Sequence, residues 1–310
     1  MDDPSPAIGA RRDDLLEIVH AVRQSLLSRD ESPAGDWVER TAEALHVGTT
    51  RGWYYPPGSG SGVAFYTVSG PEAYGHVHVA EQGGASERAE RLTGLLIDDL
   101  PSSVRSINIG FTGLSPAHEV ELLGRLSTRP GSTVIERMAM ERSLTAGDGR
   151  PPGPVPEGLA LVPIRAVTVD ALADLDFRSV RDTVDALLIG NRAEEYRRVM
   201  AALLDGSLGR FLDEASTALY QPEPPRLVGI ILSAERSPRK GIFVSFMVDP
   251  EFRRRGHGRF LFRWGLRALW ALGYERVHLW VTADNEPARQ LYREFRFEPT
   301  VRSTIYRVTR

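Results

Sequence analysis

The chain has no cysteine among its 310 residues. This absence excludes disulfides, iron–sulfur clusters and a thiol nucleophile, and it leaves a zinc ion only His and carboxylate ligands. The sequence also has no apolar run near the roughly 20 residues that span a membrane. Its first residues are acidic, without the apolar stretch of a secretory signal. We therefore expect a cytoplasmic protein without a metal site and without a membrane as partner.

The sequence also has little net charge of either sign. It contains 38 Lys and Arg against 41 Asp and Glu, a formal net charge of −3 at pH 7. Such a balance gives no general attraction to nucleic acid, so we expect no nucleic-acid partner and any basic feature must be local. The hydrophobic content of 42% is that of an ordinary globular protein.

A stretch rich in Pro and Gly near the midpoint predicts a boundary between two domains. It runs from Thr145 to Gly158 and reads TAGDGRPPGPVPEG. Hydrophobic patterning predicts that both halves close with the same order, strand–helix–strand–helix–strand. We therefore predict an α/β protein of two tandem domains, each a mixed central sheet flanked by helices, covering residues 1–148 and 159–310 with a linker at 149–158.

The second half contains an anion-binding pattern at the start of a predicted helix. The predicted strand GIFVSFMV is followed by a turn at Asp249-Pro250, three arginines, Gly-His-Gly and an amphipathic segment. A helix N-terminus offers free N–H groups and the positive end of the helix dipole. Glycines let a phosphate approach the backbone, and guanidinium groups suit its oxygens. The predicted pyrophosphate site comprises Arg253, Arg254, Arg255, Gly256, His257, Gly258 and Arg259.

Taken alone, the arginine run has two other interpretations. It is also compatible with a solvated surface patch, or with a local nucleic-acid contact that would give strongly salt-dependent binding. The nucleotide P-loop pattern is absent from this stretch, as is the Rossmann glycine pattern.

A second motif follows the next predicted strand, in the segment DNEPARQLYREF. Asn285, Ala288 and Tyr292 fall at i, i+3 and i+7, on one face of a predicted helix. Asn285 can donate and accept, Ala288 leaves room for a ligand, and Tyr292 presents a hydroxyl. An amphipathic helix explains this segment by itself, but its position one strand–helix unit after the arginines favours a shared ligand site.

Together the two motifs resemble the GNAT superfamily of acyl-CoA-dependent N-acyltransferases. The resemblance covers about residues 159–310 and rests on R-x-x-G-x-G followed by N-x-x-A-x-x-L-Y. It implies that the amides of residues 254–259 bind the pyrophosphate of coenzyme A. It also implies that the backbone of Met247 and Val248 pairs with the pantetheine arm where two strands separate, with Asn285 beside that arm. The sequence departs from the family at Arg296-Phe297, where Gly-Phe is usual.

The resemblance further implies direct attack of a primary amine on acetyl-CoA as co-substrate, without an acyl-enzyme. Tyr292 is the candidate acid that protonates the departing thiolate. The predicted strand before the arginines has no carboxylate, so the nearest acidic candidate for the general base is Glu235. An exposed turn residue explains Glu235 equally well, and a water chain to Glu214 or Ser216 is an alternative.

The first half has the predicted elements but lacks both motifs. Its corresponding loop, AEQGGASERAE, has no arginine cluster, and its later helix has neither the asparagine nor the tyrosine. We therefore expect a degenerate GNAT-like domain without a cofactor site.

Two other functions stay open: a non-catalytic acyl-CoA-binding regulatory module, and an enzyme like mycothiol synthase, whose two-copy build this length resembles. We expect a small-molecule or peptide amine as acceptor. The regions expected to bind it, residues 177–201 and 209–220, mix acids and bases, so their charge selects no particular amine. The oligomeric state is not decided by the sequence.

Overall fold

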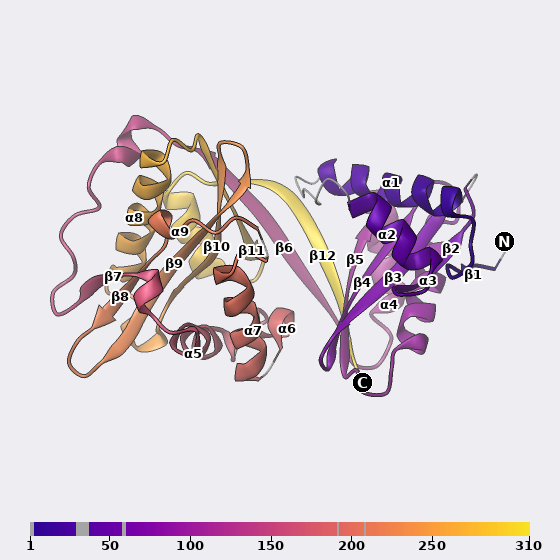
Figure 1. Cartoon of the computed structure of the whole chain (residues 1–310), viewed down its shortest axis with the longest axis horizontal. Helices are drawn as coiled ribbons and strands as arrows, with labels where there is room; N and C mark the ends of the chain where they lie inside the picture. Colours follow the sequence, from indigo (N-terminus) through magenta and orange to yellow (C-terminus); the bar gives the residue numbers. More distant parts are fainter. Residues whose placement is uncertain (1–2, 29–36, 58–59, 191, 208) are drawn as a thin grey trace. The chain divides into compact units, whose positions relative to one another are not determined.

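The computed structural model describes residues 3–28, 37–57, 60–190, 192–207 and 209–310. It has mixed sheets flanked by helices, which confirms the predicted α/β class (Figure 1). The chain divides into two compact units. The first comprises Met1–Glu136 and Ser303–Arg310, and the second comprises Arg137–Arg302.

The sheet of each unit ends on a strand that comes from the other half of the sequence. In the second unit, β6 (Ser132–Ser143) pairs antiparallel with β11 (Arg276–Thr282) through residues 137–143. In the first unit, β12 (Glu298–Thr309) pairs antiparallel with β5 (Ser106–Thr112) through residues 305–309. The units therefore differ in their borders from the two halves of the sequence on either side of the Pro- and Gly-rich stretch. A hydrophobic pattern gives a strand its two faces but does not name its neighbour.

The first unit has the strand order β1-β2-β3-β4-β5-β12. Its remaining strands are β1 (Ser5–Pro6), β2 (Arg51–Tyr55), β3 (Gly62–Ser69) and β4 (Glu72–Val79). Its helices are α1 (Arg12–Ser28), α2 (Trp37–His46), α3 (Ala85–Asp99) and α4 (Pro116–Leu126).

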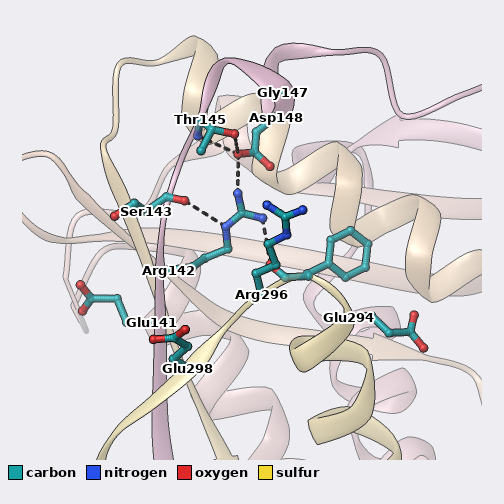
Figure 2. Close-up of a pocket in the computed structure, with 10 residues that line it drawn as sticks. Glu141, Arg142, Ser143, Thr145, Gly147, Asp148, Glu294, Arg296 and Glu298 are labelled. Carbon is teal, nitrogen blue, oxygen red and sulfur yellow. Dashed lines mark hydrogen bonds and ion pairs between the residues drawn. The ribbon is translucent and has the colours of Figure 1, made fainter.

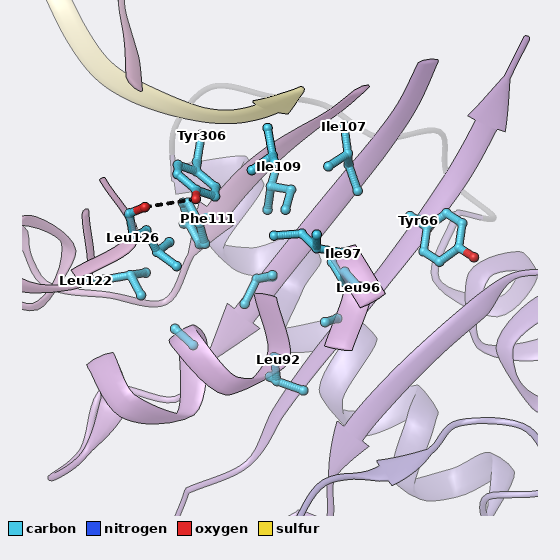
Figure 3. Close-up of a cluster of buried hydrophobic side chains, with 14 of the residues drawn as sticks. Tyr66, Leu92, Leu96, Ile97, Ile107, Ile109, Phe111, Leu122, Leu126 and Tyr306 are labelled. Carbon is cyan, nitrogen blue, oxygen red and sulfur yellow. Dashed lines mark hydrogen bonds between the residues drawn. The ribbon is translucent and has the colours of Figure 1, made fainter. Parts of the chain in front are cut away.

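The core of the first unit lies between α3, α4 and the sheet (Figure 3). Leu92 and Leu96, four residues apart on α3, share a buried cluster with Ile107 and Ile109 of β5. Tyr306 of β12 is fully buried in the same cluster, and its hydroxyl donates to the carbonyl of Leu126 at 3.0 Å. The last strand of the sequence is thus part of the core of the first unit.

The second unit has the strand order β6-β11-β10-β9-β8-β7. Its other strands are β7 (Ala160–Pro163), β8 (Thr217–Gln221), β9 (Arg226–Ser237) and β10 (Lys240–Val248). Its α-helices are α5 (Val169–Val180), α6 (Ala186–Ile189), α7 (Ala193–Leu204), α8 (His257–Ala271) and α9 (Glu286–Glu294). Short 3₁₀ turns lie at Ala146–Gly149, Ile164–Ala166, Asp213–Ala215 and Pro250–Phe252.

Two separate cores cover the two faces of this second sheet. Val277, Leu279 and Val281 of β11 pack with α8 and α9, while β9 and β10 present Ile230 and Met247 to α5 and α7. Side chains alternate along a strand, so the other residues of β11 face the side of α5 and α7. This alternation decides which side chains of β11 face the candidate site.

The pair of parallel strands at the centre differs between the two units. In the second unit, β10 and β11 pair only where residues 240–243 face residues 276–279; beyond this, β10 pairs with β9 and β11 with β6. In the first unit, β4 and β5 pair from Glu72 and Ser106 to His78 and Thr112. Within the described ranges, parallel strands therefore separate towards their carboxyl ends in the second unit and stay paired in the first.

Within the described ranges, no helix is both long and apolar enough to cross a bilayer.

Candidate active site

The turn after β10 is held by a buried carboxylate, Asp249. It accepts hydrogen bonds from Arg226 Nη2 at 2.9 Å, from Arg178 Nη2 at 3.0 Å and from the Glu251 N–H at 3.0 Å. Burial on its own raises the pKa of Asp249, but the Glu251 N–H and the two guanidinium groups outweigh it and hold that pKa below its ordinary value. The start of the loop is therefore fixed by a charged residue that stays ionised.

The loop from Arg254 to Arg259 forms a cradle of backbone amides before α8. Arg254 has φ of 61° and Gly256 has φ of 86°, left-handed conformations that turn the chain into α8. The first helical bond runs from the Phe260 N–H to the Gly256 carbonyl at 3.0 Å. Among the described residues, no group accepts a hydrogen bond from the six amides of Arg254–Arg259. These amides lie at the positive N-terminal end of α8, and the first turn of this helix has no acidic residue.

The arginine side chains around this cradle mostly have structural partners. Arg253 donates from Nε to the Val248 carbonyl at 3.1 Å and from Nη2 to the Ser179 carbonyl at 2.8 Å. The Arg255 guanidinium lies 5.4 Å from the ring centre of Phe252. These contacts tie the loop to β10 and α5 and leave its backbone amides available as donors.

The other loop residues are placed as follows. Arg259 forms an exposed ion pair with Glu294 at 2.8 Å. His257 is buried, and burial and the nearby Arg255 charge lower its pKa, which favours a neutral ring. A Cβ on Gly258 would lie 3.4 Å from the ring of Phe246, which is an ordinary van der Waals contact.

The structure brings the second motif to the gap between β10 and β11. Met247 and Val248 are half-buried on the part of β10 that has left β11. Asn285 accepts from the Ala288 N–H at 3.2 Å and so caps α9. Its side-chain amide also donates to Asp185 Oδ2 at 3.3 Å.

Tyr292 is buried on the inner face of α9. Its ring stacks on Phe262, with ring centres 5.3 Å apart. Burial raises the pKa of Tyr292 above its ordinary value; the Asp185 charge adds to this and the Arg137 charge opposes it. The phenol therefore keeps its proton throughout the neutral range and can act as a donor.

Glu235 is not brought together with these residues. It faces Gly241 at the other end of β10, and the six residue steps from Gly241 to Met247 span ~20 Å of strand. Its carboxylate accepts from the Tyr274 hydroxyl at 2.7 Å and from Arg210 Nη1 at 2.9 Å. Ser216, another sequence candidate, donates to the Leu212 carbonyl at 2.8 Å and is buried in the sheet.

Three charged residues near the gap are absent from the sequence-based set. Asp185 accepts from the Thr282 hydroxyl and from Asn285, which join it to β11 and α9. Asp176 is buried on α5, and burial together with the Asp185 charge raises its pKa to about 7. Arg137 of β6 stands opposite Thr282 in the strand pairing.

Only one of these three leaves a clear signal in the sequence. Leu172, Leu175, Asp176 and Ser179 fall at i, i+3, i+4 and i+7, so a carboxylate sits on the buried face of a helix. Arg137 gives no such signal because it precedes the Pro- and Gly-rich stretch and reaches the site through strand exchange.

A cavity of about 460 Å³ opens at the opposite, amino end of β11 (Figure 2). Its lining residues are Glu141, Arg142, Ser143, Thr145, Gly147, Asp148, Glu294, Phe295, Arg296 and Glu298. Arg142 donates to Asp148 Oδ2 at 2.5 Å and to the Phe295 carbonyl at 2.9 Å, so its guanidinium already has internal partners. We interpret these contacts as a structural joint between β6, the chain after it and the end of α9.

In the first unit, the corresponding loop is filled by its own side chains. Arg88 donates to the Gly83 carbonyl at 2.7 Å and to the Ala80 carbonyl at 3.1 Å. The carboxylate of Glu81 accepts from the Ser115 N–H at 2.6 Å, at the start of α4. This loop therefore contains an arginine bound to its own carbonyls and a negative charge at Glu81.

Among the described residues, no group of three or more His, Asp or Glu side chains is placed to hold a metal ion.

Residues 182–297 match the model of the Acetyltransferase (GNAT) family, and this segment contains the cradle, the strand gap and Tyr292. Within the second unit, these residues therefore form a domain of the GNAT family of acetyltransferases. The chain is also 30% identical over 154 residues to a mycothiol acetyltransferase of Clavibacter michiganensis subsp. michiganensis. It is 29% identical over 153 residues to a mycothiol acetyltransferase of Clavibacter sepedonicus. Each match covers about half of this chain and 47% of the relative, so the chain spans about half the length of these proteins.

Solved structures show the same fold over the whole chain. A GCN5-related N-acetyltransferase from Sphaerobacter thermophilus aligns with a TM-score of 0.65 and 16% identity, covering 100% of this chain and 96% of the other. A tandem GNAT protein from the clavulanic acid biosynthesis pathway aligns with a TM-score of 0.59 and 13% identity, covering 99% and 98%. At these identities the likeness concerns the fold, and it confirms the tandem GNAT-like arrangement.

Proposed function

We propose that the second unit transfers an acetyl group from acetyl-CoA to a primary amine. The observation that carries the proposal is the set of six amides from Arg254 to Arg259, which have no acceptor among the described residues and lie beside the gap between β10 and β11. A diphosphate needs many donors in a small space, and a helix N-terminus supplies them. The family match and the names of the relatives support acyl transfer.

In this proposal the cradle holds the pyrophosphate of the co-substrate, and the free edge of β10 at Met247–Val248 pairs with its pantetheine arm. Asn285 and Ala288 border that arm from α9. The bound acetyl-CoA supplies an activated acyl carbon and a thiolate leaving group.

The protein residues then have two proton-transfer tasks. An alkylammonium of pKa near 10 must lose a proton before its nitrogen attacks the thioester carbonyl. When the carbon–sulfur bond breaks, the thiolate takes a proton from the Tyr292 hydroxyl, which burial keeps protonated. No acyl-enzyme forms in this scheme, and the product is an amide, free coenzyme A and one proton.

We infer that Asp176 takes the proton from the ammonium. Its carboxyl is buried near Asp185, and a pKa raised to about 7 matches a general base that works near neutrality. Glu235, the candidate from the sequence, stays the alternative, although its carboxylate is engaged by Tyr274 and Arg210 at the far end of β10.

We further propose that the first unit binds no coenzyme A. Its parallel strands stay paired, Arg88 fills the loop before α3, and Glu81 covers the N-terminus of α4. A pyrophosphate there would meet the carboxylate of Glu81.

The proposed activity is tested by turnover. Purified protein is incubated with acetyl-CoA and a panel of amines, including amino acids, amino sugars, peptides and the amine precursor of mycothiol, and released thiol is measured. Acetylation of a panel member that needs Tyr292 supports the proposal. Acetyl-CoA binding without turnover on any amine favours the alternative of a regulatory acyl-CoA-binding module. Turnover confined to the mycothiol precursor favours the activity named for the Clavibacter relatives.

A further inference from the structure

Arg137 reaches the site from a part of the sequence that precedes the whole GNAT segment. It lies on β6 directly opposite Thr282, the last residue of β11. Its guanidinium lies 5.9 Å from the ring centre of Trp280. Its Nε is buried without a hydrogen-bond partner, and no ion pair joins it to a carboxylate among the described residues.

The side chain of Arg137 as a whole is half-buried, and its buried Nε is the unsatisfied atom. Burial lowers the pKa of Arg137, and Asp185 and Tyr292 act in the opposite direction. Arginine nevertheless keeps its charge, so the group retains donors that need an anionic partner. A buried charge without direct hydrogen bonds is unfavourable, and a bound anion relieves that cost.

The orientation of Arg137 places it on the acceptor side of the gap. Val281 and Leu279 of β11 pack with α8 and α9, so Trp280 and Thr282 face the side of α5, α6 and α7. Residues directly opposite in an antiparallel pair share a face, and Arg137 therefore lies on that side with Thr282. A donor thioester held near Tyr292 would approach from α9, and the amine would enter from the other face.

A negative group stands beside this arginine. Asp185 is held by Thr282 and Asn285, and its charge acts on both Arg137 and Tyr292. A cation and an anion are thus fixed around one space, next to the residue that would protonate the leaving thiolate. A ligand that carries an ammonium and a carboxylate a few bonds apart matches both charges.

We propose that Arg137 binds the carboxylate of the acceptor, and that the acceptor is an amino acid whose ammonium group lies at Asp185. The inference rests on the proposed acetyltransferase function and narrows its substrate to amines that carry a carboxylate. In this arrangement the first half of the sequence contributes a specificity residue to the catalytic unit through β6.

The test compares amines that differ only in whether they carry a carboxylate. Initial rates of acetylation are measured for free amino acids, their carboxamides and their decarboxylated amines, with wild type, Arg137→Gln, Arg137→Lys and the control Arg267→Gln. Arg267 is exposed on α8, so its variant changes net charge equally without touching the site. A charge-assisted bond to a guanidinium is worth about 10- to 100-fold in kcat/KM.

We expect wild type and Arg267→Gln to prefer the acid over its amide by about 10- to 100-fold, mainly through KM. Arg137→Gln should remove this preference while keeping its affinity for acetyl-CoA, and Arg137→Lys should keep part of it. Equal rates for acid and amide with the wild type overturn the inference, and this result needs no variant to fold. An unchanged preference in Arg137→Gln overturns it as well.

Two further outcomes separate this inference from its premises. If the wild type uses succinyl-CoA better than acetyl-CoA and Arg137→Gln loses this preference, Arg137 binds the carboxylate of the acyl donor. The assignment of Arg137 to the acceptor is then wrong. If the wild type neither binds acetyl-CoA nor acetylates any amine, the proposed function fails and the inference falls with it. Acetylation without discrimination between acid and amide overturns the inference alone.

Discussion

The side-chain amide of Asn285 donates to the carboxylate of Asp185 at 3.3 Å, while its oxygen caps α9. One residue of the predicted cofactor motif therefore also positions a charge on the acceptor side. Asp185 in turn acts on the pKa of Asp176 and of Tyr292, the proposed base and acid. The contact between Asn285 and Asp185 therefore links the cofactor motif to both the proposed base and the proposed acid.

Asn285→Ala removes both the helix cap and the contact with Asp185. We expect a loss of about 1 kcal/mol in unfolding free energy from the cap, together with a raised KM for the amine. Asn285→Ser keeps a capping oxygen but has no amide for Asp185, so it should retain stability and still show the raised KM. Denaturant unfolding and steady-state kinetics measure the two effects, and identical behaviour of the two variants would contradict the dual role.

Tyr292→Phe removes the proposed acid while keeping the ring that stacks on Phe262. We expect kcat to fall by about 10²- to 10⁴-fold with unchanged affinity for acetyl-CoA. Because the pKa of Tyr292 is raised above its ordinary value, wild-type activity should show no loss from this group between pH 7 and about pH 10. A variant that retains full kcat would assign the acid to another donor.

Asp176→Asn tests the base through the pH profile. Only ionised Asp176 accepts a proton, so wild-type kcat/KM should fall below pH of about 7. The asparagine variant should be slow at every pH and lack this limb, while Glu235→Gln should keep it. If Glu235→Gln removes the limb and Asp176→Asn does not, the base is Glu235.

The same carboxyl also affects stability. Its folded pKa lies above the unfolded value near 3.9, so the folded state binds the proton more tightly. Its stabilising contribution is present below pH of about 4 and is lost as pH rises through about 7. We therefore expect Asp176→Asn to be more stable than wild type at pH 8, with the advantage shrinking at pH 5. Thermal unfolding at the two pH values measures it, and a variant that is less stable at pH 8 would contradict the raised pKa.

Asp249→Ala leaves Arg226 and Arg178 without their shared carboxylate at the start of the cradle. Losing one partner of a buried ion pair costs about 3 kcal/mol, and binding of acetyl-CoA should weaken because the loop loses its anchor. The pKa of Asp249 is depressed on folding, so its stabilisation is present above pH of about 4 and is lost as pH falls further. Denaturant unfolding from pH 7 to pH 3 checks both statements. A variant as stable as wild type at pH 7 would contradict the anchoring role.

Tyr306→Ala tests the strand exchange. Although Tyr306 lies only four residues before the last residue of the sequence, its ring is in the core of the first unit. We expect a cost of about 3–5 kcal/mol, with faster hydrogen exchange in α3 and β5 than in α8. Leu272→Ala, at a site that is 44% exposed, is the control for an apolar truncation without a core. Faster exchange in α8 instead of α3 would contradict the assignment of β12 to the first unit.

Part of this organisation is readable from the sequence. The α/β class follows from periodicity. The phosphate cradle stays a prediction, made from glycines and arginines placed between a strand and an amphipathic helix. The sequence does not reveal which strands β6 and β12 pair with, because both have the same alternation whichever sheet they join. For that reason Arg137 stayed outside the sequence-based site, and Asp185 was one acid among several. The distance of Glu235 from Met247 likewise depends on strand register, which a single sequence does not fix.

The central claim is that the second unit binds acetyl-CoA through the amides before α8, and calorimetric titration tests it directly. Gly256 and Gly273 flank the two ends of α8 with φ of 86° and 81°, and an added Cβ at either meets nothing within 4 Å. Gly256→Asp places a carboxylate in the cradle, and Gly273→Asp places it at the far end of the helix with a similar backbone strain. The expected result is one site per chain in wild type and in Gly273→Asp, and no binding in Gly256→Asp. Two sites per chain would show that the first unit also binds, and equal binding by both variants would place the co-substrate elsewhere.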